Sequence, residues 1–520
     1  MSDLLFDRLA ELSPSAINAL TGILRGIEKE GLRVDRQGFI AQTPHPACLG
    51  HALTHPQITT DYSESLLELI TPAYNNVNQL LARLDLIHRY AQGCLGDEVL
   101  WAGSMPCRLQ GDASVPIAEY GESNIGRLKH IYRRGLEHRY GRVMQSIAGL
   151  HYNFSLPDAF WLEYQTQLGD DQSLQDFKSA QYFALIRNFR RNAWLLMYLF
   201  GASPAADRSF LEGRNHRLRP FDADTLYLPH ATSLRMSDLG YQSNAQASLK
   251  ICFNYLNTYT ETLYQAIHTP YQPYADIGVK GPDGEYRQLN ANILQIENEY
   301  YSTMRPKRTT LRGEKPVQAL RARGVEYVEV RCMDLDPFLP LGVDGHGARF
   351  LDAFLLYCLL DASPYIGDSE CQRLDDNFSK SVMRGREQGL LMEWRGELLP
   401  VAQAASRLLE RIGSVSELLA DLYGDDGYRA ALRQQQDKVR QPELTPSARI
   451  LDVLEQEGIS YLELVQELSR KHQVLLRANP INNEQRAEFD QLREQSLAEE
   501  AAIRAADQLS FEQFLQQYIA

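Results

Sequence analysis

The sequence of 520 residues has no stretch rich in proline, serine or glycine and no low-complexity segment that would mark a linker. Without a linker, a single catalytic unit over residues 1–520 is a better prediction than a string of separate domains. Within it we expect a sheet-bearing core at 20–335 and a mainly helical buttress at 350–520. The 44% hydrophobic and 23% charged shares are ordinary for a globular protein, which argues against disorder.

Cysteines are few and scattered, and long apolar runs are lacking. The seven cysteines include no Cys-x-x-Cys pair, a pattern that fits reduced thiols in a cytoplasm and shows no zinc site. The longest apolar runs, Trp194–Phe200 and Phe354–Leu360, are much shorter than the roughly 20 residues of a membrane span. We therefore expect a cytoplasmic protein without a membrane partner.

Positive charge is in deficit, since 53 basic residues face 67 acidic ones and the net charge is -14. This balance argues against nucleic acid as the main partner. The one dense basic run contains Arg305, Lys307 and Arg308, and we interpret it as a triphosphate clamp or a mobile loop. Neither a P-loop nor a Gly-x-Gly-x-x-Gly motif occurs, so ATP, if used, must be held by metals and cations.

Paired acids mark the segment Arg25–Arg33, which has the character of a strand. Glu28 and Glu30 lie two residues apart, so both side chains point to one face. Two neighbouring carboxylates repel each other, and burying them without a cation would raise a pKa or cost several kcal/mol. A divalent metal resolves this conflict. Carboxylates favour hard ions such as Mg²⁺, and a phosphorylated substrate is the common reason for one.

Further donors interrupt other strand-like segments in the same way. In Gln145–Pro157, apolar and polar residues alternate, and in Val325–Arg331 an acid and a base share one face. Together the donors could hold two or three hard cations: Glu28, Glu30, Asp61, Glu68, His151 and Glu329. Taken singly, a Glu-x-Glu pair on a strand is more often a solvated face. His151 could equally be a core histidine, and Arg331 could pair with Glu329 instead of phosphate.

The order of these elements predicts an α+β fold in which a sheet carries the site and helices support its back. Strands with polar faces are concentrated before residue 335, and helical periodicity dominates after 350. We also expect helices at 1–20, 75–100, 179–200 and 247–268, and a strand at 290–301.

Eight segments, in this order, make the chain resemble bacterial glutamate-cysteine ligases of the type 1 family. They are Arg25–Glu30, Ile58–Tyr62, Gly149–Pro157, Gly201–Pro204, Ala231–Tyr241, Leu294–Glu299, Arg305–Arg308 and Val325–Arg331. The resemblance implies a glutamine-synthetase-like catalytic domain, with a curved, mainly antiparallel sheet whose concave face carries the metals.

The resemblance also implies roles for individual residues. The six donors named above would bind two or three Mg²⁺ ions, or Mn²⁺, and Arg331 would contact the transferring phosphoryl group. Cysteine would bind among Tyr62, Tyr132, Leu136, Gln145, Ile147, Arg235, Tyr241 and Tyr301. Tyr62 stands where a relative has Phe, which adds a hydroxyl beside the thiol pocket.

The implied reaction is the ATP-dependent ligation of L-cysteine to the γ-carboxylate of L-glutamate through γ-glutamyl phosphate, the first step of glutathione biosynthesis. A monomer inhibited by glutathione is expected. Three alternatives stay open at this point: a γ-glutamyl ligase for another amine acceptor, a metal-dependent phosphohydrolase, and a metal-stabilised binding protein without catalysis.

Overall fold

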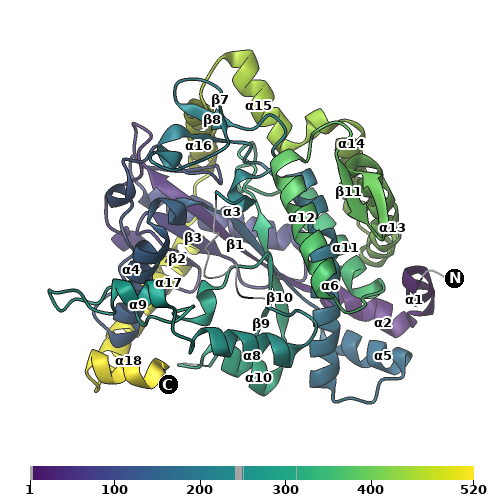
Figure 1. Cartoon of the computed structure of the whole chain (residues 1–520), viewed down its shortest axis with the longest axis horizontal. Helices are drawn as coiled ribbons and strands as arrows, with labels where there is room; N and C mark the ends of the chain where they lie inside the picture. The colour runs from purple at the N-terminus through teal and green to yellow at the C-terminus, as the bar shows by residue number, and fades with distance from the viewer. Residues whose placement is uncertain (1–3, 240–248, 250, 312, 520) are drawn as a thin grey trace.

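A seven-stranded antiparallel sheet forms the centre of the computed structural model, which describes residues 4–239, 249, 251–311 and 313–519 (Figure 1). The strand order is β2-β3-β1-β5-β10-β9, and β4 pairs with the end of β1. The strands are β1 (Leu24–Val34), β2 (Ile58–Thr60), β3 (Leu66–Ile70), β4 (Val99–Leu100), β5 (Leu150–Ser155), β9 (Met304–Lys307) and β10 (Tyr327–Met333).

Helices make up most of the rest of the described chain. They are α1 (Leu4–Glu11), α2 (Pro14–Ala19), α3 (Val77–Cys94), α4 (Asn124–Tyr140), α5 (Asp158–Leu168), α6 (Leu174–Phe200), α8 (Leu256–Ala266), α9 (Gln272–Ile277), α10 (Pro316–Arg323), α11 (Gly345–Leu360), α12 (Asp368–Arg384), α13 (Val401–Tyr423), α14 (Gly427–Arg440), α15 (Pro446–Glu457), α16 (Tyr461–Ala478), α17 (Asn483–Ala506) and α18 (Phe511–Ile519). Two small sheets, β6 (Ala205–Asp207) with β7 (Arg219–Pro220) and β8 (Thr225–Tyr227), and the hairpin of β11 (Leu391–Trp394) and β12 (Glu397–Pro400), lie apart from the main one. Among the described residues, no helix has the length and apolar character needed to cross a membrane.

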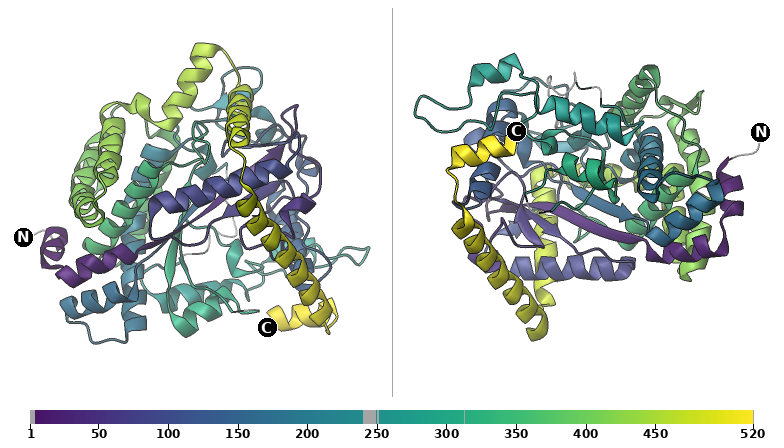
Figure 2. Two further views of the ribbon diagram at one scale, coloured as in Figure 1. Left: turned by 180° about the vertical axis from the view of Figure 1, so that it is seen from behind. Right: turned by 90° about the horizontal axis from the view of Figure 1, so that it is seen from below.

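Helices α3, α6 and α11 cover one face of the main sheet, as the view from behind shows for α3 (Figure 2). The side chains of Leu150, Tyr152 and Phe154 on this face are at most 1% exposed. His151 and Asn153 point to the opposite face, so the alternation predicted for β5 is confirmed. The α+β prediction, with an antiparallel sheet supported by helices, is also confirmed.

A buried ion pair ties the central strand to the helical layer. Arg25 on β1 and Asp352 on α11 approach to 2.9 Å with both side chains fully buried. The Tyr152 hydroxyl donates to Asp352 at 2.9 Å and the Tyr428 hydroxyl at 3.0 Å. Because each remaining carboxylate lone pair has a donor, this pair is matched rather than left as a lone buried charge.

Several expected elements differ from the structure. Residues 290–301 form no strand, because the segment is an irregular loop with a short 3-10 turn at Glu297–Glu299. The Asn290 amide donates to the Gln295 carbonyl within it, and the Asn292 amide donates to the Ile267 carbonyl after α8. The helix expected over 1–20 is broken before Pro14, which starts α2 at a Ser13 cap. Helix α4 and the β11–β12 hairpin were not anticipated.

The loop 45–55 contains three histidines and packs against α17. The Thr54 hydroxyl donates to the carbonyl of Ser496 on α17 at 2.6 Å. Both ring nitrogens of His45 are buried without a hydrogen-bond partner among the described residues. Burial lowers the pKa of His45 to about 3, with the Arg33 charge adding to the shift, and burial lowers the pKa of His55 to about 4. The loop is therefore built around neutral histidines.

Replacing His45 with Phe should make the free energy of unfolding less dependent on pH in the acidic range. The ordinary histidine pKa of 6.5 lies above the folded value, so the unfolded chain binds the proton first. The neutral His45 therefore does not lower the free energy of unfolding above about pH 6.5. Below that pH the free energy of unfolding falls by up to about 1.4 kcal/mol per pH unit. Urea unfolding between about pH 7 and pH 5 measures this slope. The exposed His216→Phe variant should keep the wild-type slope, and equal slopes in all three proteins would contradict the interpretation.

Candidate active site

The antiparallel register places acids from different strands side by side on the open face of the sheet. Glu30 on β1 lies directly opposite Glu68 on β3, and Glu28 lies opposite His151 on β5. Residues directly opposite on one face have Cβ atoms about 5 Å apart, so their side chains interact. The sequence prediction that these residues share a face is confirmed.

Glu28, Glu30, Asp61 and Glu68 form an acidic row on this face, and a potential metal-binding group lies in it. One ligand atom each of Glu28, Glu68 and His151 lie within 4.8 Å of one another. Nδ1 of the His151 ring is hydrogen-bonded to the Glu28 carboxylate at 3.3 Å. Nε2 of the same ring lies 3.6 Å from the Glu30 carboxylate. The other Glu28 oxygen accepts from the Asn153 amide at 2.8 Å. Two carboxylates and one imidazole suit a hard divalent ion such as Mg²⁺ or Mn²⁺.

The carboxylates in this row repel each other. Burial raises the pKa of Glu68 well above its ordinary value, and the charges of Glu28 and Asp61 raise it further. Burial also raises the pKa of Glu30, although His151 opposes the shift. A bound cation would remove this penalty, because it favours the ionised form of every acid around it.

Glu329 has a different environment, because two cations neutralise it. Its oxygens receive the Lys307 ammonium at 3.2 Å and the Arg331 guanidinium at 2.9 Å. Burial alone would raise the pKa of Glu329, but the charges of Lys307 and Arg331 hold it well below its ordinary value. The ion-pair alternative for Arg331 is thus realised here, while Arg331 also lines the adjoining cavity.

The basic run divides into two groups. Arg305 lies opposite Glu329 in the sheet and donates to the backbone carbonyls of Asn298 and Tyr300. Arg308 points toward α10, where it donates to the Arg323 carbonyl at 2.7 Å. Arg305 and Lys307 therefore belong to the acidic face, whereas Arg308 is engaged elsewhere.

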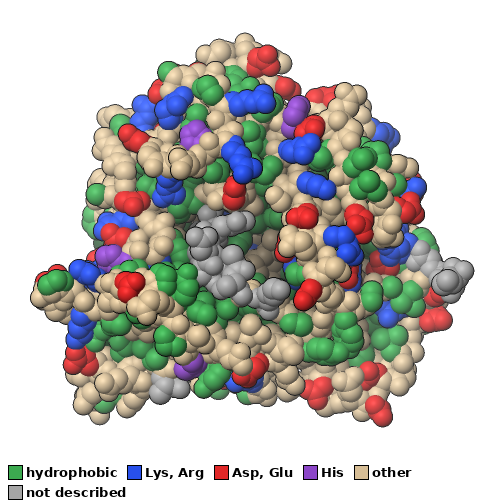
Figure 3. Space-filling view, viewed as in Figure 1, with side chains coloured by type: hydrophobic (Ala, Val, Ile, Leu, Met, Phe, Trp, Pro, Cys, Tyr) green, Lys and Arg blue, Asp and Glu red, His purple; other side chains and the backbone are tan. Residues whose placement is uncertain are grey.

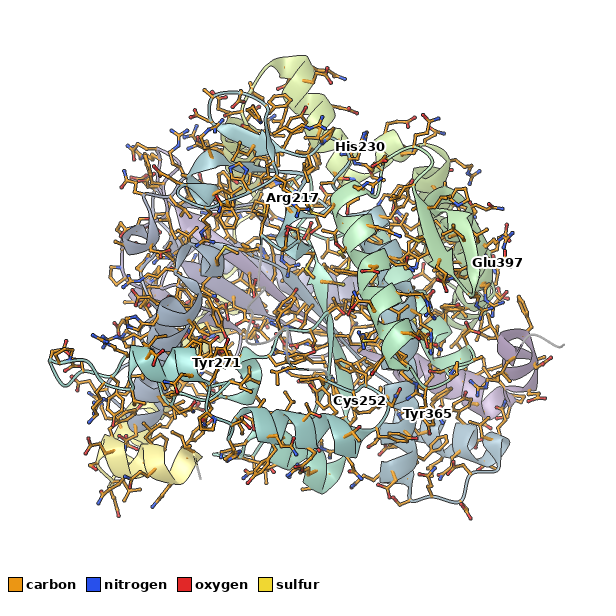
Figure 4. The ribbon with its side chains drawn as sticks, in the orientation of Figure 1. Arg217, His230, Cys252, Tyr271, Tyr365 and Glu397 are labelled. Carbon is orange, nitrogen blue, oxygen red and sulfur yellow. The ribbon has the colours of Figure 1, made fainter. Side chains whose placement is uncertain are left out.

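A cavity of about 540 Å³ opens beside the acidic row. From the viewpoint of Figure 1 the surface is hollowed near the middle of the molecule (Figure 3). Glu30, Asp61 and Arg331 line the cavity at the sheet, and Tyr271 lines it at the start of α9 (Figure 4). Five residues predicted for substrate binding also line it: Tyr62, Tyr132, Leu136, Gln145 and Tyr301.

The other predicted binding residues are placed differently. Arg235 is buried, donates to the Arg331 carbonyl at 2.9 Å and lies 3.6 Å from Asp334. An added Cβ at Gly149 would collide with this guanidinium, so a glycine is needed there. Ile147 is part of the hydrophobic core. Tyr241 lies outside the residues that the structure describes.

Tyr132 and Leu136 in one wall of the cavity were predicted from the sequence, but the helix that carries them, α4, and further residues of this wall were missed. Arg139 and Glu299 form a fully buried pair at 2.9 Å, and the Tyr140 hydroxyl donates to Glu299 at 2.6 Å. Arg133 also lines the cavity and donates to the Asp61 backbone carbonyl. The helical spacing of Leu128 with later apolar residues and the Ser123 cap could have revealed this helix.

A sequence profile of the glutamate-cysteine ligase family matches residues 9–381. The chain belongs to this family. Its reaction is the ATP-dependent joining of L-cysteine to L-glutamate, the first step of glutathione synthesis, so the protein is a ligase. A glutamate-cysteine ligase of Hahella chejuensis is 56% identical over 100% of this chain and 99% of its own length. One from Azotobacter vinelandii is 55% identical over the same shares.

Solved structures agree with this assignment. The crystal structure of the Francisella tularensis glutamate-cysteine ligase in complex with AMP has a TM-score of 0.90 and 35% identity, covering 96% of this chain and 97% of that one. A bifunctional glutathione synthetase from Pasteurella multocida shares the fold, with a TM-score of 0.71 and 24% identity over 91% of this chain and 55% of that one. The recognised family, the fold and the ligase activity predicted from the sequence are thus confirmed.

Changing Glu68 to Gln should stabilise the metal-free protein. The variant removes one buried negative charge from the row, which should raise the free energy of unfolding by about 1 to 3 kcal/mol. Because the folded pKa is raised, the penalty grows as the pH rises above the ordinary carboxylate value, and so should the gain. Urea unfolding in the presence of a chelator measures both effects.

Glu64→Gln serves as the matched control for this experiment. Glu64 accepts hydrogen bonds from the backbone N–H groups of His45 and Glu119 at 2.8 Å each, so its loss should destabilise the protein. A Glu68→Gln variant that is less stable than the wild type at neutral pH would show that repulsion does not dominate in the acidic row.

Proposed function

We propose that the acidic row holds two or three Mg²⁺ ions, with Mn²⁺ as a substitute, and that these ions position ATP beside the cavity. The ligands would be Glu28, Glu30, Asp61, Glu68, His151 and Glu329. The observation that carries this proposal is the convergence of Glu28, Glu68 and His151 from three strands within 4.8 Å. Bound metal would neutralise phosphate charge and polarise the transferred phosphoryl group.

Basic side chains of the protein would then orient the two anionic reactants, ATP and L-glutamate. Arg331 lies between the acidic row and the cavity, where its guanidinium can meet phosphate oxygens in a bidentate manner. Lys307 adds positive charge at the next strand, 3.2 Å from Glu329. These two cations would stabilise the charge that develops during phosphoryl transfer.

The chemistry follows in two displacements. The γ-carboxylate of L-glutamate attacks the γ-phosphorus of ATP, which forms γ-glutamyl phosphate and releases ADP. The α-amine of L-cysteine then attacks the acyl carbon, phosphate leaves, and the amine loses its proton. The enzyme contributes mainly by holding the reactants in this geometry.

The cavity supplies the acceptor site. We assign cysteine to the region of Tyr62, Tyr132 and Tyr301, where Leu136 and Gln145 complete the wall. Ile147, Arg235 and Tyr241 remain in the proposed set, with Arg235 acting from behind Gly149. Glutathione contains the same γ-glutamyl-cysteinyl unit as the product, so it would compete for this cavity as a feedback inhibitor.

The open face of the sheet also supports one direction for the bound nucleotide. The cavity adjoins Glu30, and from there the face continues past Glu28 and Gly26 to Leu24, a span of about 20 Å along β1. Leu24 is 42% exposed and lies opposite Ser155, while Tyr327 lies opposite Lys307. The triphosphate would lie over the middle of this face, with the adenine toward Leu24 and Tyr327.

Glu30→Gln should abolish ADP release, with a loss on the order of 100-fold or more, because a metal ligand next to the transferred phosphoryl group is lost. A coupled ADP assay with glutamate and cysteine measures the rate. Mg²⁺ should also raise the melting temperature of the wild type but not of the variant. The exposed Glu467→Gln variant is the control, and full activity of Glu30→Gln would refute the ligand assignment.

The same assay separates the alternatives. ADP release that requires both amino acids supports the ligase, and replacement of cysteine by other amines tests another acceptor. Phosphate release without glutamate would support the phosphohydrolase instead.

Tyr327→Leu should weaken ADP binding about tenfold, because base stacking on an aromatic ring is worth roughly 1 to 3 kcal/mol. Inorganic tripolyphosphate with Mg²⁺ lacks the base, and its affinity should not change. Isothermal titration measures both ligands. Equal losses for the two, or no loss for ADP, would show that Tyr327 does not contact the adenine.

A further inference from the structure

A second cavity, of about 330 Å³, lies on the opposite side of the sheet. It is bounded by the ends of β5 and β10, the end of α6, the loop after β10, and α14. None of its lining residues lines the first cavity. Leu150, Phe200, Met333, Val343 and Leu444 give it an apolar floor. No step of the proposed reaction uses this space.

A buried lysine faces the second cavity. Lys438 on α14 is 8% exposed, and its ammonium donates to the carbonyl of Leu199 at the end of α6, at 2.9 Å. This bond caps α6, and the ammonium also lies over the Phe200 ring, 4.6 Å from its centroid, so hydrogen bonding to a protein acceptor uses one of its three N–H groups. Among the described residues, no carboxylate lies within the 4.0 Å of an ion pair with Lys438. Burial lowers the pKa of Lys438 to about 8, against the opposing charges of Asp336 and Asp344.

Four carboxylates and a second cation complete the wall. Asp334 lies 3.6 Å from Arg235 and Asp437 pairs with Arg440 at 3.2 Å, which leaves Asp336 and Asp344 without an ion pair among the described residues. One oxygen of Asp336 accepts the Phe338 N–H at 3.0 Å, and one oxygen of Asp344 accepts the Gly347 N–H at 2.7 Å. Each of these two carboxylates keeps a second oxygen for a ligand. Arg449 is exposed at the rim, where its guanidinium stacks on the Phe338 ring at 4.1 Å. Cations and anions therefore flank an apolar floor in a space that suits a small molecule.

We propose that this cavity binds a free α-amino acid with an aliphatic side chain. The ligand's carboxylate would meet Lys438 and Arg449, its ammonium would meet Asp336 and Asp344, and its side chain would lie on the apolar floor. Asp336 and Asp344 would repel a simple anion, and Lys438 and Arg449 would repel a simple amine, which favours a zwitterion that meets each pair with the opposite charge.

The second cavity is connected to the active site through one strand. Asp334 also lines the cavity and accepts hydrogen bonds from the Ser203 and Ser233 hydroxyls. It lies 3.6 Å from Arg235, which donates to the Arg331 carbonyl. Asp334 in the wall of the second cavity is thus linked through Arg235 to the backbone of Arg331.

Isothermal titration with L-leucine tests the proposal, with L-2-aminobutyrate present at saturation to occupy the first cavity. We expect saturable binding of one equivalent at millimolar concentrations. Isocaproate, which lacks the amine, and isopentylamine, which lacks the carboxylate, should bind at least about tenfold more weakly, because each loses a charge-assisted hydrogen bond. No saturable binding of leucine, or equal binding of the three probes, would overturn the proposal.

Lys438→Met keeps the aliphatic stem and should weaken leucine binding about tenfold or more. The exposed Lys471→Met variant is the matched control and should bind leucine normally. Thermal unfolding reports whether loss of the α6 cap has damaged the fold, and in that case the exposed Arg449→Ala variant provides the test. Undiminished binding in a folded Lys438→Met protein, or in Arg449→Ala if that variant replaces it, would place leucine elsewhere and overturn the assignment.

Discussion

Like charges held together on one face of an antiparallel sheet are the constraint on which the active site depends. The register alone puts Glu30 opposite Glu68 and Glu28 opposite His151. Burial and mutual repulsion raise the pKa of Glu68, while Lys307 and Arg331 lie at the other side of the face. The protein without ligands thus retains a region of uncompensated negative charge. Relief of this repulsion would contribute to the free energy of cation binding.

Such a region needs a rigid support, because side chains that repel each other would otherwise move apart. The opposite face of β1 supplies it through the buried Arg25–Asp352 pair and through Lys29, whose ammonium lies 2.8 Å from the His88 ring. Burial lowers the pKa of Lys29 to about 7, so this residue, flanked in sequence by two acids, carries only part of a positive charge at neutral pH. Further positive charge for the acidic row must therefore come from the open side of the sheet.

The alternation of polar and apolar residues was sufficient to predict which strand side chains face the site, but it did not predict the loops. The alternation in β5 and β10 identified which side chains face the site, because a strand has a period of two whatever its neighbours. The segment 290–301 looked equally like a strand, yet its backbone groups bond to side chains such as Asn290 and Glu299 instead of to a ladder. Residues such as Arg139 and Glu299 are paired over 160 positions, and no local pattern reveals such a partner.

The uneven distribution of cations across the sheet gives the site a direction. Positive side chains are gathered on β9 and β10, at Arg305, Lys307 and Arg331, whereas the β3 side carries Glu68 without a cation at ion-pair distance among the described residues. A polyphosphate is attracted to the first side directly and can approach the second only through metal ions. Phosphate oxygens would consequently lie between the two sides, with the transferred group nearest to Arg331, which also lines the cavity proposed for the acceptor.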